Sequence, residues 1–357
     1  MQILKKIFYE INNLFKINQT DRPWHMPLST AISTSGPLFI GAISGHMAQA
    51  TVASLAGLVF LYTLKTPIHH RMVVLMACSF GMIVSFVFGS FSHINPSLLP
   101  LILGIITTIT TMIVRFYKLP TPGNFFFMMI ATLAAFMPFK TEALIQISGY
   151  FMLGTIWACF VSFLYGLSTV KFIKPEPIPK IEYDGFDDVV LDSVILGVFV
   201  SLSVFLADFI GFDKPYWVPI STLAILQGMT LKSKWTRQIH RILGTCLGII
   251  LTYFLLSVYL NSYEIAILIA VLTFLIEFSV VRNYGIAAIF ITPLTVYMAE
   301  INGVISGNAT DLIVTRLEDI IFGSFVGFIG GVCLHSIKFR NIVKFIVLFL
   351  SKNRIND

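Results

Sequence analysis

The stretch VVLDSVILGVFVSLSVFLADF, residues 189–209, contains two acidic side chains, Asp192 and Asp208, and is otherwise apolar or small. About 20 such residues in a helix cross the hydrocarbon core of a bilayer. The rest of the chain has the same character: 56% of its 357 residues are hydrophobic, 12% are charged, and the mean hydropathy is +0.86. A water-soluble protein of this size needs more charge to cover its surface. We therefore predict an all-α integral membrane protein.

Apolar runs of similar length predict about twelve transmembrane helices. They lie near residues 27–45, 48–64, 71–90, 97–114, 124–139, 142–166, 189–209, 215–230, 241–258, 263–280, 284–300 and 315–336. The sixth and seventh runs are separated by a polar stretch that contains three prolines and is too short to form a domain. Such a stretch is typical of a linker.

This pattern divides the chain into five parts. We predict a cytoplasmic amphipathic N-terminal segment (1–26), a first six-helix membrane half (27–166), a cytoplasmic linker (167–188), a second six-helix membrane half (189–336) and a cytoplasmic tail (337–357).

The distribution of basic residues predicts the orientation. Twenty-one of the 24 Lys and Arg residues fall in alternate connections and the terminal segments, which all lie on one side of the membrane. The opposite loops carry Lys140 and Lys214, and Arg316 begins the last span. Because basic loops stay in the cytoplasm, both termini are expected to be cytoplasmic in a multi-pass protein of the plasma (inner) membrane. The basic amphipathic N-terminal segment favours contact with membrane lipids, and no nucleic-acid-binding motif is present, so no nucleic acid partner is expected.

Short markers recur in the two halves. Leu64-Lys65 followed by His70-Arg71 is echoed by Leu231-Lys232 followed by His240-Arg241, and Gly123 and Gly285 open the fifth and eleventh spans. Because six spans return the chain to the same side, the halves are predicted to be parallel repeats related by an axis along the membrane normal. A transport pathway is then expected along that axis, between the halves.

The segment 215–248 combines charge with close-packing residues. Arg237 and Arg241 lie one helical turn apart at the cytoplasmic end of a span, where they can attract an anion. The alternative is that they only fix the topology and bind lipid headgroups. Gly244 and Gly248 have the GxxxG spacing that lets two helices approach closely. Gly327 and Gly331 have the same spacing in the last span.

The same segment carries a family resemblance. Its elements are Tyr216-Trp217, Gln227-Gly228, the Arg237 and Arg241 pair, Gly244-Thr245 with Gly248, and a later Arg316-Leu317-Glu318-Asp319 with Gly323. This pattern resembles the fusaric acid resistance-like superfamily (FUSC), which includes aromatic acid exporters and is related to the plant aluminium-activated malate transporters. The resemblance is good over 215–330 and weaker over 27–166. It implies an inner-membrane protein that moves organic acids, outward in direction.

Further path candidates come from the repeat. His70-Arg71 in the first half occupies the same position as His240-Arg241 in the second half. The two arginines can therefore face each other and form a cationic entrance. The alternative is that they only fix the topology. Arg115 and Glu277 fall at equivalent positions with opposite charge; they can pair near the axis or lie separately at the cytosolic interface, with Glu277 near Arg282. Thr111 belongs to a polar stripe, and Trp217 lies about twenty residues before Arg237 in the segment 215–248.

We expect a secondary exporter of small organic or aromatic acids. A passive organic-anion channel and a non-transporting membrane component of an efflux assembly remain alternatives, and a homo-oligomer or a periplasmic adaptor are possible partners besides the small organic anions. No Walker A, HExxH or GxSxG pattern is present, and the histidines have no metal-ligand spacing. The chain is therefore not expected to be an enzyme or to hold a cofactor or metal.

Overall fold

The computed structural model describes residues 17–172, 174–178, 186–212, 215–227, 231–301 and 309–343; the side chains of 186–187, 231–237, 299–301 and 309–314 are not described. Within these ranges the chain is helical and forms no strand. The predictions for residues 1–16, for linker residues 179–185 and for the tail beyond residue 343 lie outside the described residues.

The helices follow one another as two groups of six. The first group is α2 (His25–Ser44), α3 (Met47–Ala56) with its 3-10 extension η1 (Gly57–Tyr62), α4 (Ile68–Ser90), α5 (Leu99–Phe116), α6 (Phe125–Phe136) and α7 (Leu144–Thr169). The second group is α8 (Phe186–Ile210), α9 (Trp217–Leu226), α10 (Leu231–Leu256), α11 (Ser262–Val280), α12 (Tyr284–Ile301) and α13 (Ala309–His335). Three short 3-10 turns, η2 (Phe91–His93), η3 (Pro96–Leu98) and η4 (Thr141–Ala143), lie in the connections of the first group. Each span expected from the sequence overlaps one helix of the described residues.

Eight described helices are long and apolar enough to cross a bilayer. They are His25–Ser44, Ile68–His93, Pro96–Phe116, Thr141–Thr169, Asp188–Ile210, Gln238–Leu256, Ser262–Val280 and Thr315–His335. Four apolar helices are shorter: Met47–Tyr62, Phe125–Phe136, Trp217–Leu226 and Tyr284–Met298. The chain is therefore a multi-pass helical membrane protein. The short helices are the second and fifth of each group, and α6 ends just before Pro138, which disfavours helix at the residue that precedes it.

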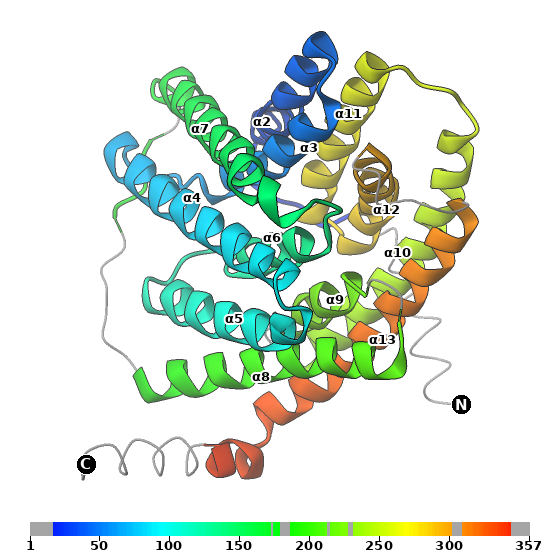
Figure 1. Ribbon diagram of the computed structural model, residues 1–357. Coiled ribbons are helices and arrows are strands. Elements are labelled where there is room, and N and C mark those ends of the chain that lie inside the picture. The colour runs from blue at the N-terminus through cyan, green and yellow to red at the C-terminus, as the bar shows by residue number, and fades with distance from the viewer. Residues whose placement is uncertain are drawn as a thin grey trace.

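Helix contacts follow the same order in both groups. Within the first group α4 packs on α6 and α3 on α7, and within the second α10 packs on α12 and α9 on α13. The two most extensive contacts between the groups are α5 with α8 and α2 with α11, and α6 also contacts α9 and α3 contacts α12. Figure 1 shows α6 and α9 in the interior of the bundle, and every residue of α9 is buried. The short helices α6 and α9 are thus surrounded by other helices.

Glycines bring several of these pairs together. A Cβ added at Gly154 of α7 would lie 2.1 Å from the Ala53 carbonyl oxygen of α3, and one added at Gly323 of α13 would lie 2.3 Å from the Val218 carbonyl oxygen of α9. Neither position can hold a larger residue unless the backbones move apart, because real Cβ atoms do not approach an oxygen so closely.

The glycines expected to pack helices lie at such contacts. A Cβ at Gly244 or Gly248 would meet α12, at 2.5 Å from the Gly285 carbonyl oxygen and 2.6 Å from the Ile289 carbonyl oxygen respectively. A Cβ at Gly327 would lie 2.7 Å from the Thr222 carbonyl oxygen of α9, whereas Gly331 is buried and its carbonyl lies 2.9 Å from His335 Nδ1. The close α10–α12 contact fixes the direction of α10, which carries Arg241.

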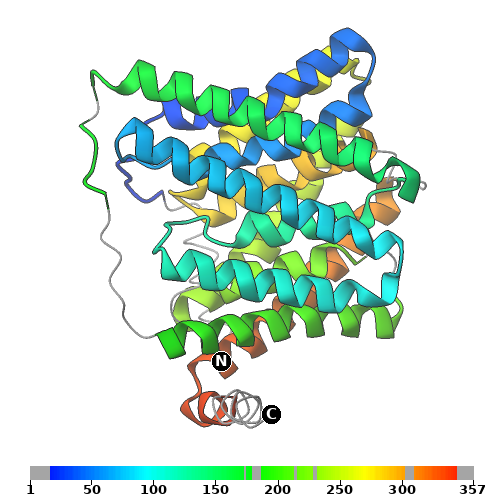
Figure 2. The same cartoon turned by 60° about the vertical axis from the view of Figure 1, so that its left-hand side comes forward.

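One end of the bundle gathers charged residues from several connections. The Asn18 side chain donates to the Arg282 carbonyl at 2.8 Å, and the Glu176 backbone donates to the Lys65 carbonyl at 3.0 Å. Figure 2 shows that the end of α7 and the start of α8 lie at this same end. We call this end of the bundle, which contains Asn18, Lys65, Glu176 and Arg282, the basic end. That it faces the cytoplasm remains a prediction.

Candidate functional site

A cavity of about 1980 Å³ lies between the two groups of helices. At the basic end its wall includes Arg22, Lys65 and His70, and the wall also includes Arg241 and Trp217. The cavity therefore occupies the region between the halves in which the sequence predicts a pathway.

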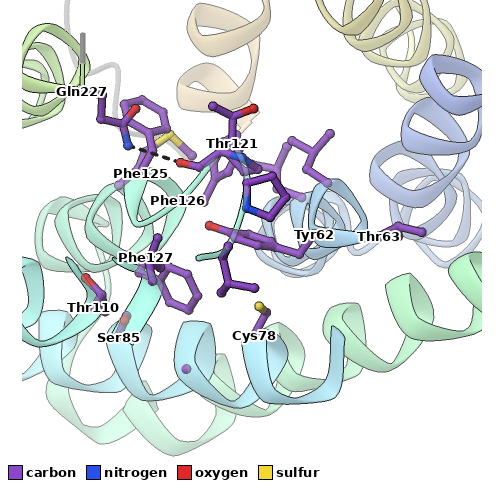
Figure 3. A pocket seen from close by; sticks show the side chains of 18 of the residues that line it. Tyr62, Thr63, Cys78, Ser85, Thr110, Thr121, Phe125, Phe126, Phe127 and Gln227 are labelled. Carbon is purple, nitrogen blue, oxygen red and sulfur yellow. Dashed lines mark hydrogen bonds between the residues drawn. The ribbon is translucent and has the colours of Figure 1, made fainter. Parts of the chain in front are cut away.

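Aromatic side chains form one wall of this cavity. Tyr62, Phe125, Phe126 and Phe127 gather there (Figure 3), together with aliphatic residues of α4 and α5. The Tyr62 hydroxyl donates to the Gly123 carbonyl at 2.7 Å, which ties the end of η1 to the connection between α5 and α6. Most of the cavity surface is consequently apolar, so isolated polar groups on its wall stand out.

A chain of hydrogen bonds joins the two groups beside the cavity. Gln227, at the end of α9, donates to the Pro122 carbonyl at 3.2 Å and to Asn124 Oδ1 at 3.1 Å. Asn124 in turn donates to Thr111 Oγ1 at 2.6 Å. Thr111 is buried and its hydroxyl donates to the Thr107 carbonyl. The structure therefore places Thr111 in a contact that holds the α5–α6 connection.

Arg241 is buried and lies on the cavity wall. Its Nε and Nη2 donate to Ser221 Oγ at 3.3 and 3.0 Å, and its Nη1 donates to the Tyr284 hydroxyl at 2.8 Å. Among the residues that the structure describes, no carboxylate forms an ion pair with it. Because only neutral groups among the described residues hold this buried guanidinium, an anion in the adjoining cavity is favoured.

Arg71 has a different environment. Its Nη2 donates to the Thr66 carbonyl at 3.2 Å, and a Cβ added at Gly166 of α7 would lie 3.2 Å from its Nη1. The guanidinium thus packs against α7, and Arg71 is not part of the cavity wall, although His70 is. The structure does not bring Arg71 and Arg241 together there. His240 is buried outside the cavity wall, and the side chain of Arg237 lies outside the described residues.

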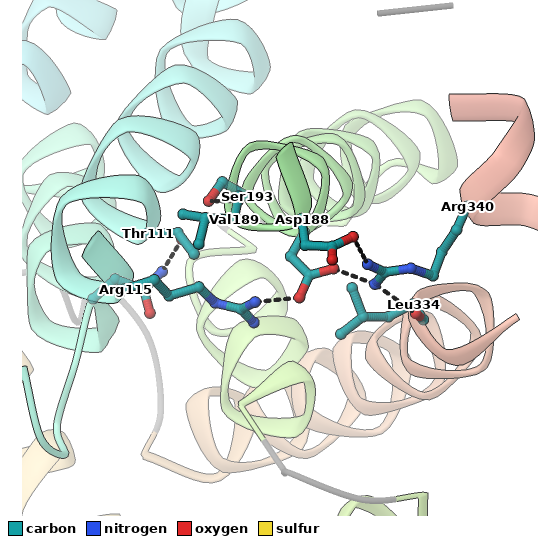
Figure 4. Close-up of polar contacts among 9 residues, drawn as sticks. Thr111, Arg115, Asp188, Val189, Ser193, Leu334 and Arg340 are labelled. Atoms are coloured by element: carbon teal, nitrogen blue, oxygen red, sulfur yellow. Dashed lines mark hydrogen bonds and ion pairs between the residues drawn. The ribbon is translucent and has the colours of Figure 1, made fainter. Parts of the chain in front are cut away.

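Arg115 and Glu277 do not pair with each other. Arg115 pairs with Asp192, which also pairs with Arg340. Figure 4 shows Arg115 and Arg340 on opposite sides of the helix that carries Asp188 and Ser193. Glu277 lies on the cavity wall and pairs with Arg22 at 2.7 Å. Both ion pairs lie at the basic end. Arg282 does not contact the Glu277 carboxylate, and its guanidinium lies 3.8 Å from the centre of the Phe278 ring.

Trp217, the first residue of α9, contacts a residue that the sequence did not single out as a site. The Arg316 guanidinium lies 4.1 Å from the centre of a Trp217 ring and donates to Thr295 Oγ1. Asp319 Oδ2 accepts a hydrogen bond from the Trp217 backbone N–H at 3.3 Å. The signal in the sequence was a charged pair, Arg316 and Asp319, one turn apart inside an apolar span, which marks residues that face a bundle interior.

The comparisons with known proteins concern the part of the chain that holds these residues. Residues 202–330 match the family described as "Fusaric acid resistance protein-like". The chain is 31% identical over 153 residues to "Uncharacterized membrane protein YvaC" from Bacillus subtilis (strain 168). That match covers 43% of this chain and 24% of the relative's length, so the chain spans about a quarter of the curated relative that it matches. No solved structure matches the chain. Trp217, Arg241 and Arg316 all fall within the matched residues.

Proposed function

We propose that the chain, which matches the fusaric acid resistance-like family over residues 202–330, is a secondary transporter that exports small organic acids, aromatic acids among them, across the plasma (inner) membrane. The observation that carries this proposal is Arg241, a buried cation on the wall of a largely apolar cavity. At an effective dielectric constant of about 20, a carboxylate about 4 Å from one guanidinium gains roughly 4 kcal/mol. This gain offsets part of the free energy that the anion loses when it leaves water.

The proposed architecture is two parallel six-helix repeats with twelve spans and cytoplasmic termini. Three observations support it: equivalent helices pack on one another in both groups, the second and fifth helices of each group are short, and glycines form the matching α3–α7 and α9–α13 contacts. The short helices α6 and α9 can lie at membrane depth because other helices and the cavity surround them, so their ends are not exposed to lipid. The cavity then lies near the axis that relates the repeats.

Flux through the purified protein tests this function. Proteoliposomes that contain the full chain are loaded with radiolabelled benzoate or hexanoate, and efflux is followed with and without a pH gradient. We expect saturable efflux that accelerates under the gradient. Currents that follow the anion equilibrium potential, with no dependence on the pH gradient, would instead identify a passive anion channel. Flux no faster than in protein-free vesicles for every acid would reject transport of these acids altogether.

A matched pair of variants distinguishes the effect of the cation on the cavity wall from the effect of basic charge elsewhere in the protein. Arg241→Gln removes the guanidinium on the cavity wall, and Arg282→Gln removes one at the basic end that lies on Phe278, outside the wall. We expect Arg241→Gln to lower the efflux rate about tenfold or more, since a charge-assisted contact is lost, while Arg282→Gln leaves it within about twofold. Folded yield by size-exclusion chromatography controls for misfolding. Equal losses in both variants would show that Arg241 acts through net charge and not through the cavity.

A further inference from the structure

A second buried arginine lies next to Arg241. Trp217 and Ser221 are one helical turn apart on α9, so their side chains lie on the same face of that helix. Arg316, from α13, lies over Trp217, and Arg241, from α10, donates to Ser221. Three helices therefore bring two guanidinium groups together within about one turn of α9. Arg241 is 5% exposed and Arg316 is 4% exposed.

The charges around this pair do not balance among the described residues. Asp319 is buried nearby, but its carboxylate accepts from the Trp217 backbone and forms no ion pair with either arginine. Glu318 is exposed. Two cations thus face one buried carboxylate. Because an unbalanced charge at membrane depth costs a few kcal/mol, the cluster has a free-energy reason to accept an anion from the cavity.

Unused hydrogen-bond donors point to where that anion binds. Trp217 is 4% exposed and lies on the cavity wall, yet its Nε1 has no hydrogen-bond partner in the part of the chain described, and the same holds for Arg316 Nε. Buried N–H groups in native proteins are nearly always hydrogen-bonded. Arg316 itself lies behind the wall, since Trp217 and Thr295, both of which it contacts, line the cavity.

From this geometry we infer that Trp217 and Arg241 form a binding site for a single carboxylate group, with Arg316 as a positioning residue behind them. The indole Nε1–H and the Arg241 guanidinium are the direct donors. Arg316 holds the indole by the cation–π contact and adds a second positive charge. The wall beside them is apolar, with Ile220, Leu294 and Met298, so the site fits a monocarboxylate attached to an apolar body. This inference rests on the proposed function, because it names the substrate class and the residues that recognise it.

The first test measures binding without transport. The full chain carries Trp24, Trp157, Trp217 and Trp235. Replacing the other three with Phe leaves Trp217 as the sole reporter of indole fluorescence. We expect hexanoate to change this fluorescence saturably, its neutral counterpart hexanamide to have no effect, and adipate, a dicarboxylate of the same length, to bind about tenfold more weakly. Equal responses to hexanoate and hexanamide, or tighter binding of adipate, would overturn the inference.

The second test uses the flux assay with Trp217→Phe, Arg316→Gln and Arg316→Lys. Trp217→Phe removes the N–H donor, and Arg316→Gln removes the rear charge; each is expected to raise KM for hexanoate about tenfold with a smaller effect on kcat. Arg316→Lys keeps the charge and should recover part of the affinity, which a packing role alone would not predict. Wild-type flux with an unchanged KM in Trp217→Phe and Arg316→Gln would reject this site and leave the proposed function intact.

Another outcome would support the carboxylate site and reject the transport function. If the wild type carries no carboxylate across the membrane but the Trp217 reporter binds hexanoate and not hexanamide, the site stands and the transport function fails. If a variant does not fold, the reporter protein still decides the inference, because it keeps Trp217, Arg241 and Arg316 unchanged.

Discussion

The two His-Arg dipeptides occupy equivalent places in the two halves, yet their arginines have different surroundings. Arg241 lies on the cavity wall and donates to Ser221 and Tyr284, whereas Arg71 donates to the Thr66 carbonyl and packs against α7. Both are buried. The same dipeptide at the same helix end therefore does not determine where the guanidinium goes.

The neighbouring helices explain the difference. If the Gly154–Ala53 contact is superposed on the Gly323–Val218 contact, Ala56 takes the place of Ser221 and Val52 takes the place of Trp217. Ile147 likewise takes the place of Arg316, and Pro122 takes the place of Tyr284 when Gly123 is matched with Gly285. The first half thus lacks the hydroxyls that hold Arg241 and the cation behind it. In the proposed two-repeat architecture the two halves share a scaffold, whereas the proposed anion site is built by the second half alone.

The largest expected effect tests the shared scaffold. Gly154→Ala and Gly323→Ala each place a methyl group against a backbone oxygen of the partner helix, and such overpacking costs about 1–3 kcal/mol. We expect both variants to lower the thermal unfolding midpoint in detergent by similar amounts. Gly149→Ala, also on α7 but with no atom within 4 Å of the added Cβ, is the control and should be neutral. A loss confined to one of the two glycines would break the equivalence of the α3–α7 and α9–α13 contacts.

A smaller effect tests the asymmetry of the arginines. Arg71→Gln should leave KM for benzoate or hexanoate within about twofold of wild type, whereas Arg241→Gln raises it about tenfold, because only Arg241 adjoins the cavity. Initial rates over a range of substrate concentrations, normalised to folded protein in the vesicles, measure both values. Similar increases in KM would mean that both arginines reach the substrate, as a cationic entrance formed from both halves requires.

The sequence predicts the helices well because each long apolar run has one stable conformation in a bilayer. It does not predict which runs are short: the run 215–230 contains α9 over Trp217–Leu226, and the run 124–139 contains α6 over Phe125–Phe136. Where an apolar helix begins and ends inside a bundle depends on tertiary contacts and on residues such as Pro138, so the apolar run alone overestimates its length.

The sequence likewise predicts only part of the candidate site. The charge and spacing within 215–248 point to Arg241 as a path candidate, the family resemblance adds Trp217, and the structure puts both on the cavity wall. No spacing rule could have placed Arg316 over Trp217 or joined Arg22 to Glu277, because these contacts connect helices that are far apart in the chain. The direction of Arg71 depends on space beside Gly166, which is likewise a tertiary property.

The two largest junctions between the halves offer a further comparison. At the α5–α8 contact Arg115 pairs with Asp192, and at the α2–α11 contact Glu277 pairs with Arg22. Arg115 and Glu277 hold equivalent positions with opposite charge, and each has a partner of the opposite sign across its junction. Each junction therefore contains an ion pair, and the signs of the two charges are reversed between the junctions. The two ion pairs differ in the number of their members, because Asp192 also binds Arg340.

The smallest expected effect uses this reversal. The Arg22–Glu277 pair has no third member like Arg340, so it is the simpler one to test. Glu277→Arg alone places two cations together and should lower the free energy of unfolding. The double variant Arg22→Glu with Glu277→Arg restores an ion pair with the charges exchanged. The coupling energy between the two positions is expected to be about 1 kcal/mol, because both side chains are mostly but not fully buried. Thermal unfolding of the two single variants and the double variant gives this value as a double-mutant cycle. Additive changes would show that the 2.7 Å contact contributes no stability of its own, and the second junction would then depend on packing between α2 and α11 alone.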